Sequence, residues 1–530
     1  MATVASARLR LWAAVAILCA PPLLFGIQGT RNLDWPDDPD LFREGALAQS
    51  FADGHLLDDP YYLGEWIWYP PLVPALVAVL SKITGSPVHT VYAQAGAYLN
   101  MLGPILFAAL VARLFGSLAS LVALTMFLYR IPRGPTGALP LHSTLLYSGN
   151  FAQALFYLTL LAYVGFPEKH RFRYAATGLL LGLAFLGHAA PFVVLSPLFL
   201  AEFARAAARE PRTALKRYSL LFAAAALAAT PLLVSIVGRY HLQVRNPAPT
   251  QWIAWSATST AIARQVDGYT WTACLALVVL WVRGPREGAW VVTEWIAAAV
   301  ALVGYSFAAA PRGWPAVVPR HHVLFYVRVA QAVLIGYGAS ALWSAARQWI
   351  DRSRLLPRPH AMLTREPARW VVTVGGALLV LLVTLPAQAR RAGPGRTGII
   401  PDSTIKSGLD AYRWMRSALR PDDVVLATDE RALMVVGPAG AKVVVLESLF
   451  GNLYVDHSRR AIARDEMFTA LRRGDDATFE ALADEYSVTH VLWVGADGPW
   501  FDPVPFPGLA LAFDTGNTRI YRRTPARRRP

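Results

Sequence analysis

The first four hundred residues of this chain contain about eleven apolar stretches, each close to the length of a membrane span. A helix needs about 20 mostly apolar residues to cross the hydrocarbon core of a bilayer. The stretches lie at 9–28, 89–112, 115–130, 148–166, 174–188, 189–205, 218–238, 269–283, 289–310, 323–345 and 370–388. Between 174–188 and 189–205, Gly187-His188-Ala-Ala-Pro191 indicates either a turn or a kink. We therefore expect a mainly α, polytopic membrane helical bundle of about 11 spans.

The charge pattern agrees with this class. Only 16% of the 530 residues are charged, whereas soluble domains carry about a quarter. A net charge of +15 would favour a nucleic-acid partner in a soluble protein. Here the arginines cluster between apolar stretches, which is typical of loops kept on the cytoplasmic side. We expect contact with membrane lipids and no nucleic-acid partner, and no disulfide between the two cysteines, Cys19 and Cys274, which both lie in apolar stretches.

The stretch at 70–84 decides the sidedness. If it crosses the membrane, the basic clusters alternate badly with Arg8 and Arg10, whereas all of them fall on the cytoplasmic side if it lies along the outer interface. We expect a juxtamembrane helix, a cytoplasmic N-terminus and an outside C-terminus. Arg8 and Arg10 also suit a signal peptide, but Pro21-Pro22 and the acidic loop favour an uncleaved anchor. The Ala-, Arg- and Val-rich composition favours a bacterial plasma membrane.

From about residue 400 the composition becomes that of a soluble domain. Strands are predicted at 424–427, 443–446 and 490–494, helices at 459–473 and 476–486, and a hairpin from 509–513 and 519–522. This alternation predicts a small α/β domain, without a GxGxxG or P-loop motif for a nucleotide. We place a transmembrane domain at 1–388, with an acidic first outer loop at 29–88. A soluble extracytoplasmic α/β domain follows at 389–530.

Four carboxylates lie close together just after the first apolar stretch, in Asp34-Trp-Pro-Asp37-Asp38-Pro-Asp40. Such a cluster is costly near a low-dielectric surface unless it is fully solvated or used. Asp38 or Asp40 would serve as a general base toward an acceptor hydroxyl. The alternative is a turn in which an aspartate caps a helix that starts near Leu41. Two close carboxylates also suit a divalent metal ion, but they are too few to predict one, so we expect no cofactor.

These residues belong to a longer set of motifs. Asp38-x-Asp40 is followed by Tyr69-Pro70-Pro71-Leu72, by an Arg113-Leu-Phe-Gly turn and by Gly178-Leu-Leu-Leu-Gly182 ahead of Gly187-His188. With the soluble C-terminal domain, this set resembles the GT-C superfamily of glycosyltransferases. The superfamily includes protein O-mannosyltransferases, aminoarabinose transferases and mycobacterial arabinosyl- and mannosyltransferases.

The resemblance implies a fold of GT-C type and a polyprenyl-phosphate-linked sugar as donor. It also implies that an acidic residue of the first outer loop is the catalytic base, which carries over to Asp38 or Asp40. The spacing to Gly54 leaves the choice between the two open. The usual Lys or Arg before the Pro-Pro pair is absent, with Tyr69 in its place. This difference argues against an aminoarabinose transferase in particular.

A basic group lies where an outer loop enters the tenth stretch: Arg312, Arg320, His321, His322 and Arg328. Of these, Arg320, His321 and Arg328 are the candidate phosphate ligands. A guanidinium binds phosphate bidentately and stays charged, which suits a lipid-phosphate leaving group. The alternatives are an ordinary loop charge for Arg320 and snorkelling toward the interface for Arg328. His188 suits either the donor phosphate or an acceptor hydroxyl; alternatively, it is a helix-end histidine bonded to the backbone.

Aromatic residues of the first loop are candidates for stacking on a sugar or prenyl chain. Tyr69 is the one we place in the site, and Tyr61, Tyr62, Trp66 and Trp68 accompany it. The alternative is an interfacial aromatic belt, which needs no ligand. No role is assigned from the sequence to His55, Asp58, Asp59 and Glu65.

Together these features predict an inverting, metal-independent transferase. It would move a sugar from polyprenyl phosphate to a cell-envelope glycan, lipid or protein acceptor on the outer face of the membrane. The alternative is a non-catalytic carrier, flippase or scaffold for lipid-linked glycans, because a fold does not fix a function. A transporter would place polar residues deep within several spans and often shows inverted repeats, and neither is evident in the sequence.

Overall fold

The chain folds as two compact units in a computed structural model. The described residues are 2–36, 38–129, 143–251, 266–309, 312, 314, 318–353, 366–391, 402–495, 506 and 508–524. The helical unit comprises Met1–Asn32, Gln94–Ala229 and Thr250–Gly395. The α/β unit comprises Leu33–Ala93, Thr230–Pro249 and Arg396–Pro530.

Each predicted apolar stretch forms a helix. These helices are α1 (Ala2–Thr30), α4 (Val88–Leu99) with α5 (Leu102–Phe115), α6 (Ser117–Tyr129), α7 (Ser148–Gly165), α8 (Arg171–Gly187), α9 (Ala189–Ala207), α10 (Pro211–Leu233), α13 (Gly268–Arg283), α14 (Arg286–Ala309), α15 (Arg320–Ser353) and α17 (Glu366–Arg391). Among the described residues, seven helices are long and apolar enough to cross a membrane, and α6 and α13 are shorter apolar helices. The multi-pass bundle is confirmed, and the count of eleven spans stays a prediction.

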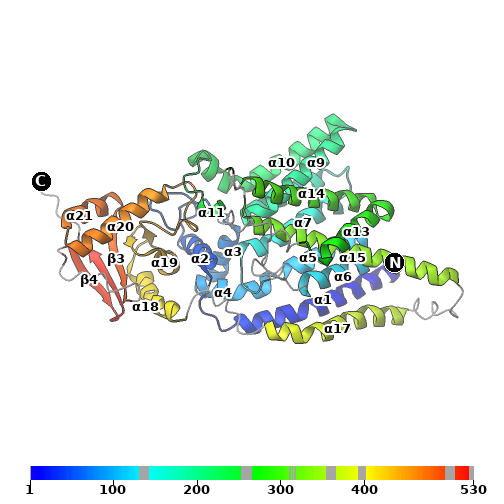
Figure 1. The fold of residues 1–530 in the computed structure, drawn as a ribbon, viewed down its shortest axis with the longest axis horizontal. Helices are drawn as coiled ribbons and strands as arrows, with labels where there is room; N and C mark the ends of the chain where they lie inside the picture. The colour runs from blue at the N-terminus through cyan, green and yellow to red at the C-terminus, as the bar shows by residue number, and fades with distance from the viewer. Residues whose placement is uncertain are drawn as a thin grey trace. The chain divides into compact units, whose positions relative to one another are not determined.

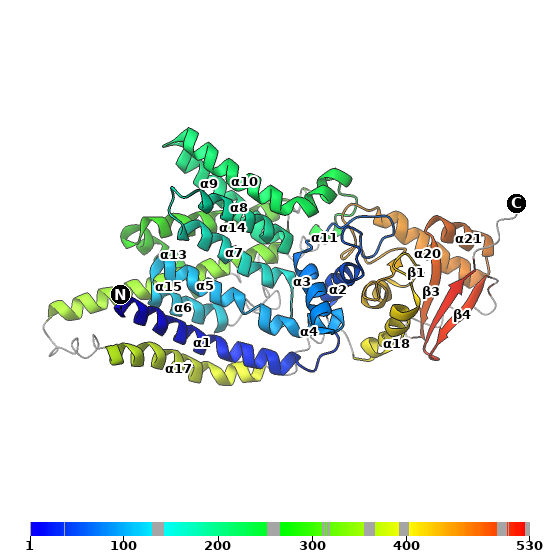
Figure 2. The same cartoon turned by 180° about the vertical axis from the view of Figure 1, so that it is seen from behind.

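The helical unit is built from neighbouring helix pairs. The first and last long helices, α1 and α17, run side by side (Figures 1 and 2). Aromatic rings fill the interior, where Phe107 stacks on Phe127 with centroids 4.9 Å apart. Phe156 lies 4.9 Å from the fully buried Trp295 and 4.6 Å from Tyr326. The core of this unit is therefore a set of interlocked rings between helices.

Two glycines let α8 approach α10 closely. A Cβ atom at Gly178 would lie 2.1 Å from the carbonyl oxygen of Leu221, and one at Gly182 would lie 2.3 Å from that of Ala225. Small residues four positions apart permit such backbone contact between membrane helices. The Gly-Leu-Leu-Leu-Gly motif thus acts as a packing surface.

The α/β unit contains a five-stranded sheet in the order β2-β1-β3-β5-β4. Its strands are β1 (Val424–Leu426), β2 (Lys442–Val443), β3 (Val488–Val494), β4 (Leu509–Asp514) and β5 (Thr518–Arg523). β1 is parallel to β2 and β3, whereas β5 is antiparallel to β3 and β4. The predicted α/β class and hairpin are confirmed. β2 is shorter than the predicted strand at 443–446.

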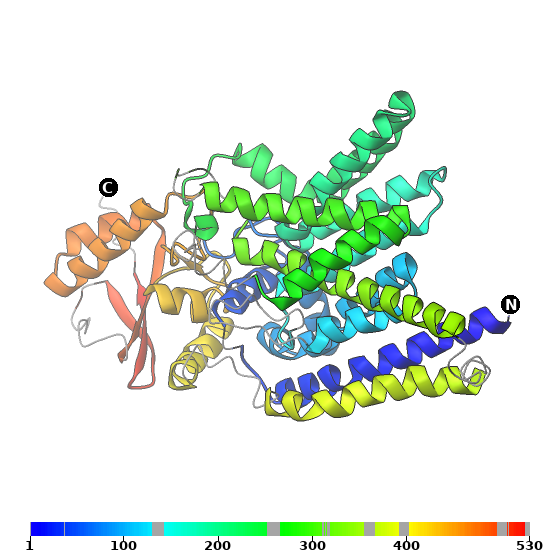
Figure 3. The same ribbon diagram turned by 45° about the vertical axis from the view of Figure 1, so that its right-hand side comes forward.

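Helices cover both faces of this sheet (Figure 3). Val424 and Leu426 pack with α20 (His457–Arg473) and α21 (Asp476–Glu485), whereas Val425 between them packs with α18 (Asp402–Ala418). Successive strand residues point to opposite faces, so this alternation buries both sides. The connection after β1 contains α19 (Asp429–Arg431) and the π-helix η3 (Ala432–Val436).

The acidic first-loop segment belongs to the same unit. It contains α2 (Pro39–Ala52) and α3 (Leu72–Thr84), which pack against each other. The Val443 amide donates to the Tyr61 carbonyl at 2.7 Å, so the loop continues the hydrogen bonding of β2. Residues 230–249, with the π-helix η1 (Val234–Arg239) and the start of α11 (Ala248–Gln251), complete the unit. The Ser235 hydroxyl in η1 donates to the Ile67 carbonyl.

Candidate active site

Asp38 stands at the start of α2 as its N-cap. Its backbone is extended (φ −127°), and one carboxylate oxygen accepts from the Asp40 amide at 2.9 Å. Pro39 fills the first helical position, where no amide hydrogen is needed. An aspartate therefore caps this helix, as the alternative interpretation predicted, but the helix begins at Pro39 and not near Leu41. Capping satisfies one of the helix's free amides and leaves the carboxylate ionisable, so the role of Asp38 as a base stays a prediction.

Asp40 begins a polar chain that leads to Tyr69. Its carboxylate pairs with Arg43 at 2.9 Å and is half exposed. The Arg43 guanidinium lies 4.0 Å from the centre of the Tyr69 ring. The Tyr69 hydroxyl donates to the buried Glu44 carboxylate at 3.1 Å. Burial raises the pKa of Tyr69 well above its usual range, although Arg43 opposes this shift. Tyr69 therefore contacts the acidic helix directly.

Arg43 was missed as a site residue. Its spacing of three from Asp40 on a capped helix was the available signal, because such residues are neighbours on a helix surface. Its Nε is buried and has no hydrogen-bond partner within the described part of the chain. The Arg43 guanidinium is thus held by Asp40 and Tyr69, next to the acid that the sequence predicts as a base.

The other predicted site residues lie in the helical unit. His188 is extended between α8 and α9, and its Nδ1 accepts from the Ala190 amide at 3.1 Å. The interpretation as a helix-end histidine bonded to backbone is thus observed, and a turn rather than a kink separates the two helices. Because Nδ1 accepts, the neutral ring carries its proton on Nε2. The His188 ring also lies 4.5 Å from that of His322.

Arg328 is half-buried on α15 and has interaction partners in the structure. Arg320 and His321 start the same helix, and their side chains lie outside the described residues, as does Asp37. The structure places His188 beside His322, which belongs to the basic group predicted at the start of this helix. Among the described residues, no group of three or more His, Cys, Asp or Glu has a metal-binding arrangement.

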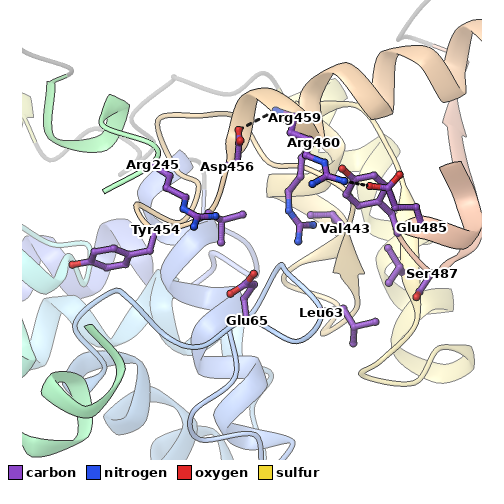
Figure 4. A pocket seen from close by; sticks show the side chains of 13 residues that line it. Leu63, Glu65, Arg245, Val443, Tyr454, Asp456, Arg459, Arg460, Glu485 and Ser487 are labelled. Carbon is purple, nitrogen blue, oxygen red and sulfur yellow. Dashed lines mark hydrogen bonds and ion pairs between the residues drawn. The ribbon is translucent and has the colours of Figure 1, made fainter. Parts of the chain in front are cut away.

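A cavity of about 310 Å³ lies within the α/β unit (Figure 4). Four segments that are distant in sequence supply charged groups to its wall: Glu65 from the first loop, Arg245 from 230–249, Arg459 and Arg460 from α20, and Glu485 from α21. Arg459 pairs with Glu485 at 2.7 Å. The Arg460 guanidinium lies 4.6 Å from the Tyr62 ring centre and donates to the Val444 carbonyl at 3.0 Å.

The remaining wall of this cavity is aromatic and acidic. Tyr454 lines it while its ring stacks on Tyr240 at 4.8 Å. Asp456 lines it too, and its carboxylate accepts from the Arg459 amide at 3.1 Å. Fixed cations, carboxylates and a ring suit a ligand rich in hydroxyls, which both donate and accept hydrogen bonds. Sequence reasoning missed this cavity because segments far apart in the chain build it.

No protein-family model matches this chain, and no curated protein matches it. Several solved membrane enzymes are similar over almost its whole length. The arabinofuranosyltransferase AftD from Mycobacteria shares 15% identity at a TM-score of 0.54, with 96% of this chain and 39% of that chain covered. The oligosaccharyltransferase AglB from Archaeoglobus fulgidus, in complex with an inhibitory peptide and a dolichol-phosphate, shares 11% identity at 0.52, with 97% and 74% covered.

ArnT from Cupriavidus metallidurans, bound to undecaprenyl phosphate, shares 14% identity at a TM-score of 0.50, and 96% of this chain and 97% of that chain are covered. The TM-scores of 0.50 to 0.54 show a common fold, whereas identities of 11% to 15% leave the reaction to be argued from the residues. The motifs in the sequence predicted this fold, and the structure confirms it. The chain is a multi-pass membrane protein with the GT-C fold of these glycosyltransferases.

Proposed function

We propose that this protein is an inverting glycosyltransferase that takes a sugar from a polyprenyl-phosphate donor. The acceptor is a cell-envelope glycan, lipid or protein on the outer face of the membrane. The observation that carries the proposal is the acidic helix α2, which follows the first apolar helix on a GT-C fold. This helix holds Asp38 at its cap and Asp40 beside Arg43. Structures of the same fold include complexes with a dolichol-phosphate and with undecaprenyl phosphate.

The chemistry needs one base and cationic ligands for phosphate. Asp38 or Asp40 takes the proton of an acceptor hydroxyl, whose oxygen then attacks the anomeric carbon from the face opposite the phosphate. The bond between that carbon and the phosphate oxygen breaks as the new glycosidic bond forms. Polyprenyl phosphate carries its charge without a proton, so no second carboxylic acid is needed, unlike in glycoside hydrolysis. We assign the phosphate to Arg320 and Arg328, with His321 and His188 as further ligands.

The two aspartates differ in ways that an experiment can use. Asparagine caps a helix about as well as aspartate, so Asp38→Asn retains the start of α2 and removes the base. Asp40→Asn retains the shape of the side chain and weakens its pairing with Arg43. Asp53→Asn is a matched control, because Asp53 follows the last residue of α2 and pairs with Arg416 at 2.8 Å.

The test is transfer by the purified full chain in lipid nanodiscs, with a panel of polyprenyl-phosphate sugars and acceptors. We expect the substitution at the base to lower kcat by about a hundredfold or more, and Asp53→Asn to leave it unchanged. Full transfer by the Asp38→Asn, Asp40→Asn double variant would refute the assignment. Donor binding without turnover across the panel would instead favour a carrier.

We also assign the acceptor to the cavity of about 310 Å³ in the α/β unit. Its wall offers charged side chains and the ring of Tyr454, and it belongs to the same unit as α2. The side chain of Arg245 is exposed, so Arg245→Gln removes a charge with little risk to folding. In the same assay we expect it to raise the acceptor KM about tenfold, the loss of one charge-assisted hydrogen bond. An unchanged acceptor KM would remove the acceptor from this cavity.

A further inference from the structure

A second cavity, of about 520 Å³, lies within the helical unit where five arginines meet. They are Arg173 on α8, Arg205 on α9, Arg209 after α9, Arg217 on α10 and Arg286 on α14. All five lie at the end of the bundle where α9 finishes and where α8, α10 and α14 begin. The sequence predicts that these basic clusters face the cytoplasm.

Two of these arginines are neutralised within the protein. Arg205 pairs with Glu202 and lies 3.5 Å from the Glu294 carboxylate. Arg217 pairs with Glu168 at 2.9 Å. The Tyr163 hydroxyl donates to Glu202 at 2.8 Å and lies 2.8 Å from the Tyr218 hydroxyl. This network fixes Glu202 against Arg205, so neither group is left to bind a ligand.

The other three arginines are not matched by carboxylates. Arg173, Arg209 and Arg286 form no ion pair with any described residue, and neither does Glu210, an acidic residue of the same wall. Glu287, the remaining carboxylate there, lies 4.0 Å from Arg113 outside the cavity. Three guanidinium groups therefore face one carboxylate, and the cavity has a surplus of positive charge.

Arg173 carries one of these unmatched charges in a buried position, where its guanidinium is only partly hydrogen-bonded. Its side chain is only 8% exposed, and its guanidinium lies 4.1 Å from the Tyr163 ring centre. One terminal nitrogen donates weakly to the Phe166 carbonyl at 3.5 Å, whereas Nε has no hydrogen-bond partner among the residues described. A buried donor without a partner destabilises a protein, and more so when it is charged. An anion in the cavity would supply the missing acceptor.

We propose that this cavity binds the phosphate group of an anionic phospholipid, with Arg173, Arg209 and Arg286 as its cationic ligands. Basic pockets between membrane helices on the cytoplasmic side recognise such head groups. A guanidinium presents two parallel donors to a phosphate. A lipid with a net neutral head group also carries a cation, which the surplus positive charge of the cavity repels. The site is independent of sugar transfer, because none of its residues belongs to the proposed reaction.

The test compares lipid binding to the full chain by native mass spectrometry, without any measurement of transfer. Arg209 and Arg286 are exposed, so Arg209→Gln, Arg286→Gln removes two charges with little risk to the fold. Arg212→Gln, Arg283→Gln is the matched control, since both side chains are exposed at the same end of the bundle and neither lines the cavity. Thermal midpoints verify that both variants fold.

We expect the unmodified protein to bind phosphatidylglycerol more tightly than phosphatidylcholine, and the Arg209→Gln, Arg286→Gln variant to lose about twentyfold in phosphatidylglycerol affinity. The control variant should lose at most about twofold. Equal loss in both variants, or no preference between the two lipids, would overturn the proposal. The last measurement is the binding of inorganic phosphate to the same proteins. If it binds as tightly as the lipid and is weakened by the same variant, the site belongs to soluble phosphates, which also overturns it.

Discussion

Asp59 has no role that can be recognised in the sequence, yet the structure surrounds it with donors. It is fully buried, and its carboxylate accepts from the amides of Tyr61 and Tyr62 and from the Asn452 side chain at 2.8–2.9 Å. The Lys442 ammonium donates to its carbonyl at 2.5 Å. Burial raises the pKa of the Asp59 carboxyl, and the hydrogen bonds from the Tyr61 and Tyr62 amides oppose that shift. Asp59 therefore ties the first loop to β2 through its backbone carbonyl, and to Asn452 through its carboxylate.

We expect Asp59→Ala to destabilise the α/β unit by about 3 kcal/mol or more, because it leaves the two buried amides of Tyr61 and Tyr62 without an acceptor and removes one acceptor of the Asn452 side chain. Asp59→Asn retains one acceptor oxygen and should cost less. The measurement is the thermal midpoint of the purified protein, with Asp58→Ala as the control. Asp58 is half exposed and contacts His55 at 2.9 Å. Equal midpoints for the Asp58 and Asp59 alanine variants would contradict this role.

At this scale the sequence predicts what is local. The cap at Asp38 and the spacing from Asp40 to Arg43 can be read from a few consecutive residues. The contact of Tyr69 with Glu44, the pairing of His188 with His322, and the surroundings of Asp59 join distant parts of the chain. No local pattern of polar and apolar residues contains that information.

Among the elements, α8 and α10 depend on two glycines. Gly178→Leu would place its Cβ 2.1 Å from the carbonyl oxygen of Leu221, a backbone atom that moves only if α10 moves. Overpacking of this kind costs about 1–3 kcal/mol or more, so we expect a clear drop in the thermal midpoint. Gly304→Leu on α14 is the control, because a Cβ there meets no described atom within 4 Å. Similar midpoints for the two variants would show that α8 and α10 do not pack through these glycines.

The helices were predictable because each depends on its own run of apolar residues. The end of α3 could also be predicted from the sequence, because it is followed by Gly85, which adopts the left-handed conformation (φ 70°) that glycine adopts readily. β2 was not: it ends at Val443, and the Leu446 amide donates to the Tyr62 hydroxyl at 3.2 Å instead of to a strand. A partner from the first loop shortens this strand, and sequence alone does not reveal that partner.

For the whole molecule, the sidedness predicted from the basic clusters can be tested by labelling. After Cys19 and Cys274 are replaced by serine, single cysteines are introduced as Ser86→Cys, Asp476→Cys or Arg352→Cys. An impermeant thiol reagent should label the first two in intact cells, and Arg352→Cys only after permeabilisation. The opposite pattern would overturn the orientation. Labelling of Ser86→Cys only after permeabilisation would show that the stretch at 70–84 crosses the membrane.

At the same scale, composition and contacts divide the chain differently. Hydropathy changes near residue 389, which is all that a pattern along the sequence can report. The contacts instead join 33–93 and 230–249 to the C-terminal part, because buried groups such as Asp59 and Tyr61 find their partners there. The GT-C fold was predictable from motifs, whereas this grouping required the structure.

The bond between the first loop and β2 also sets an order in time for biosynthesis. Asp59 and Lys442 are 383 positions apart in the chain, so at about 5 to 20 residues per second a ribosome needs roughly 20 to 80 seconds to pass from one to the other. Throughout that interval the loop that carries Asp38 and Asp40 lacks the strand that completes its hydrogen bonds. The segment made among the first is therefore among the last to reach its final structure.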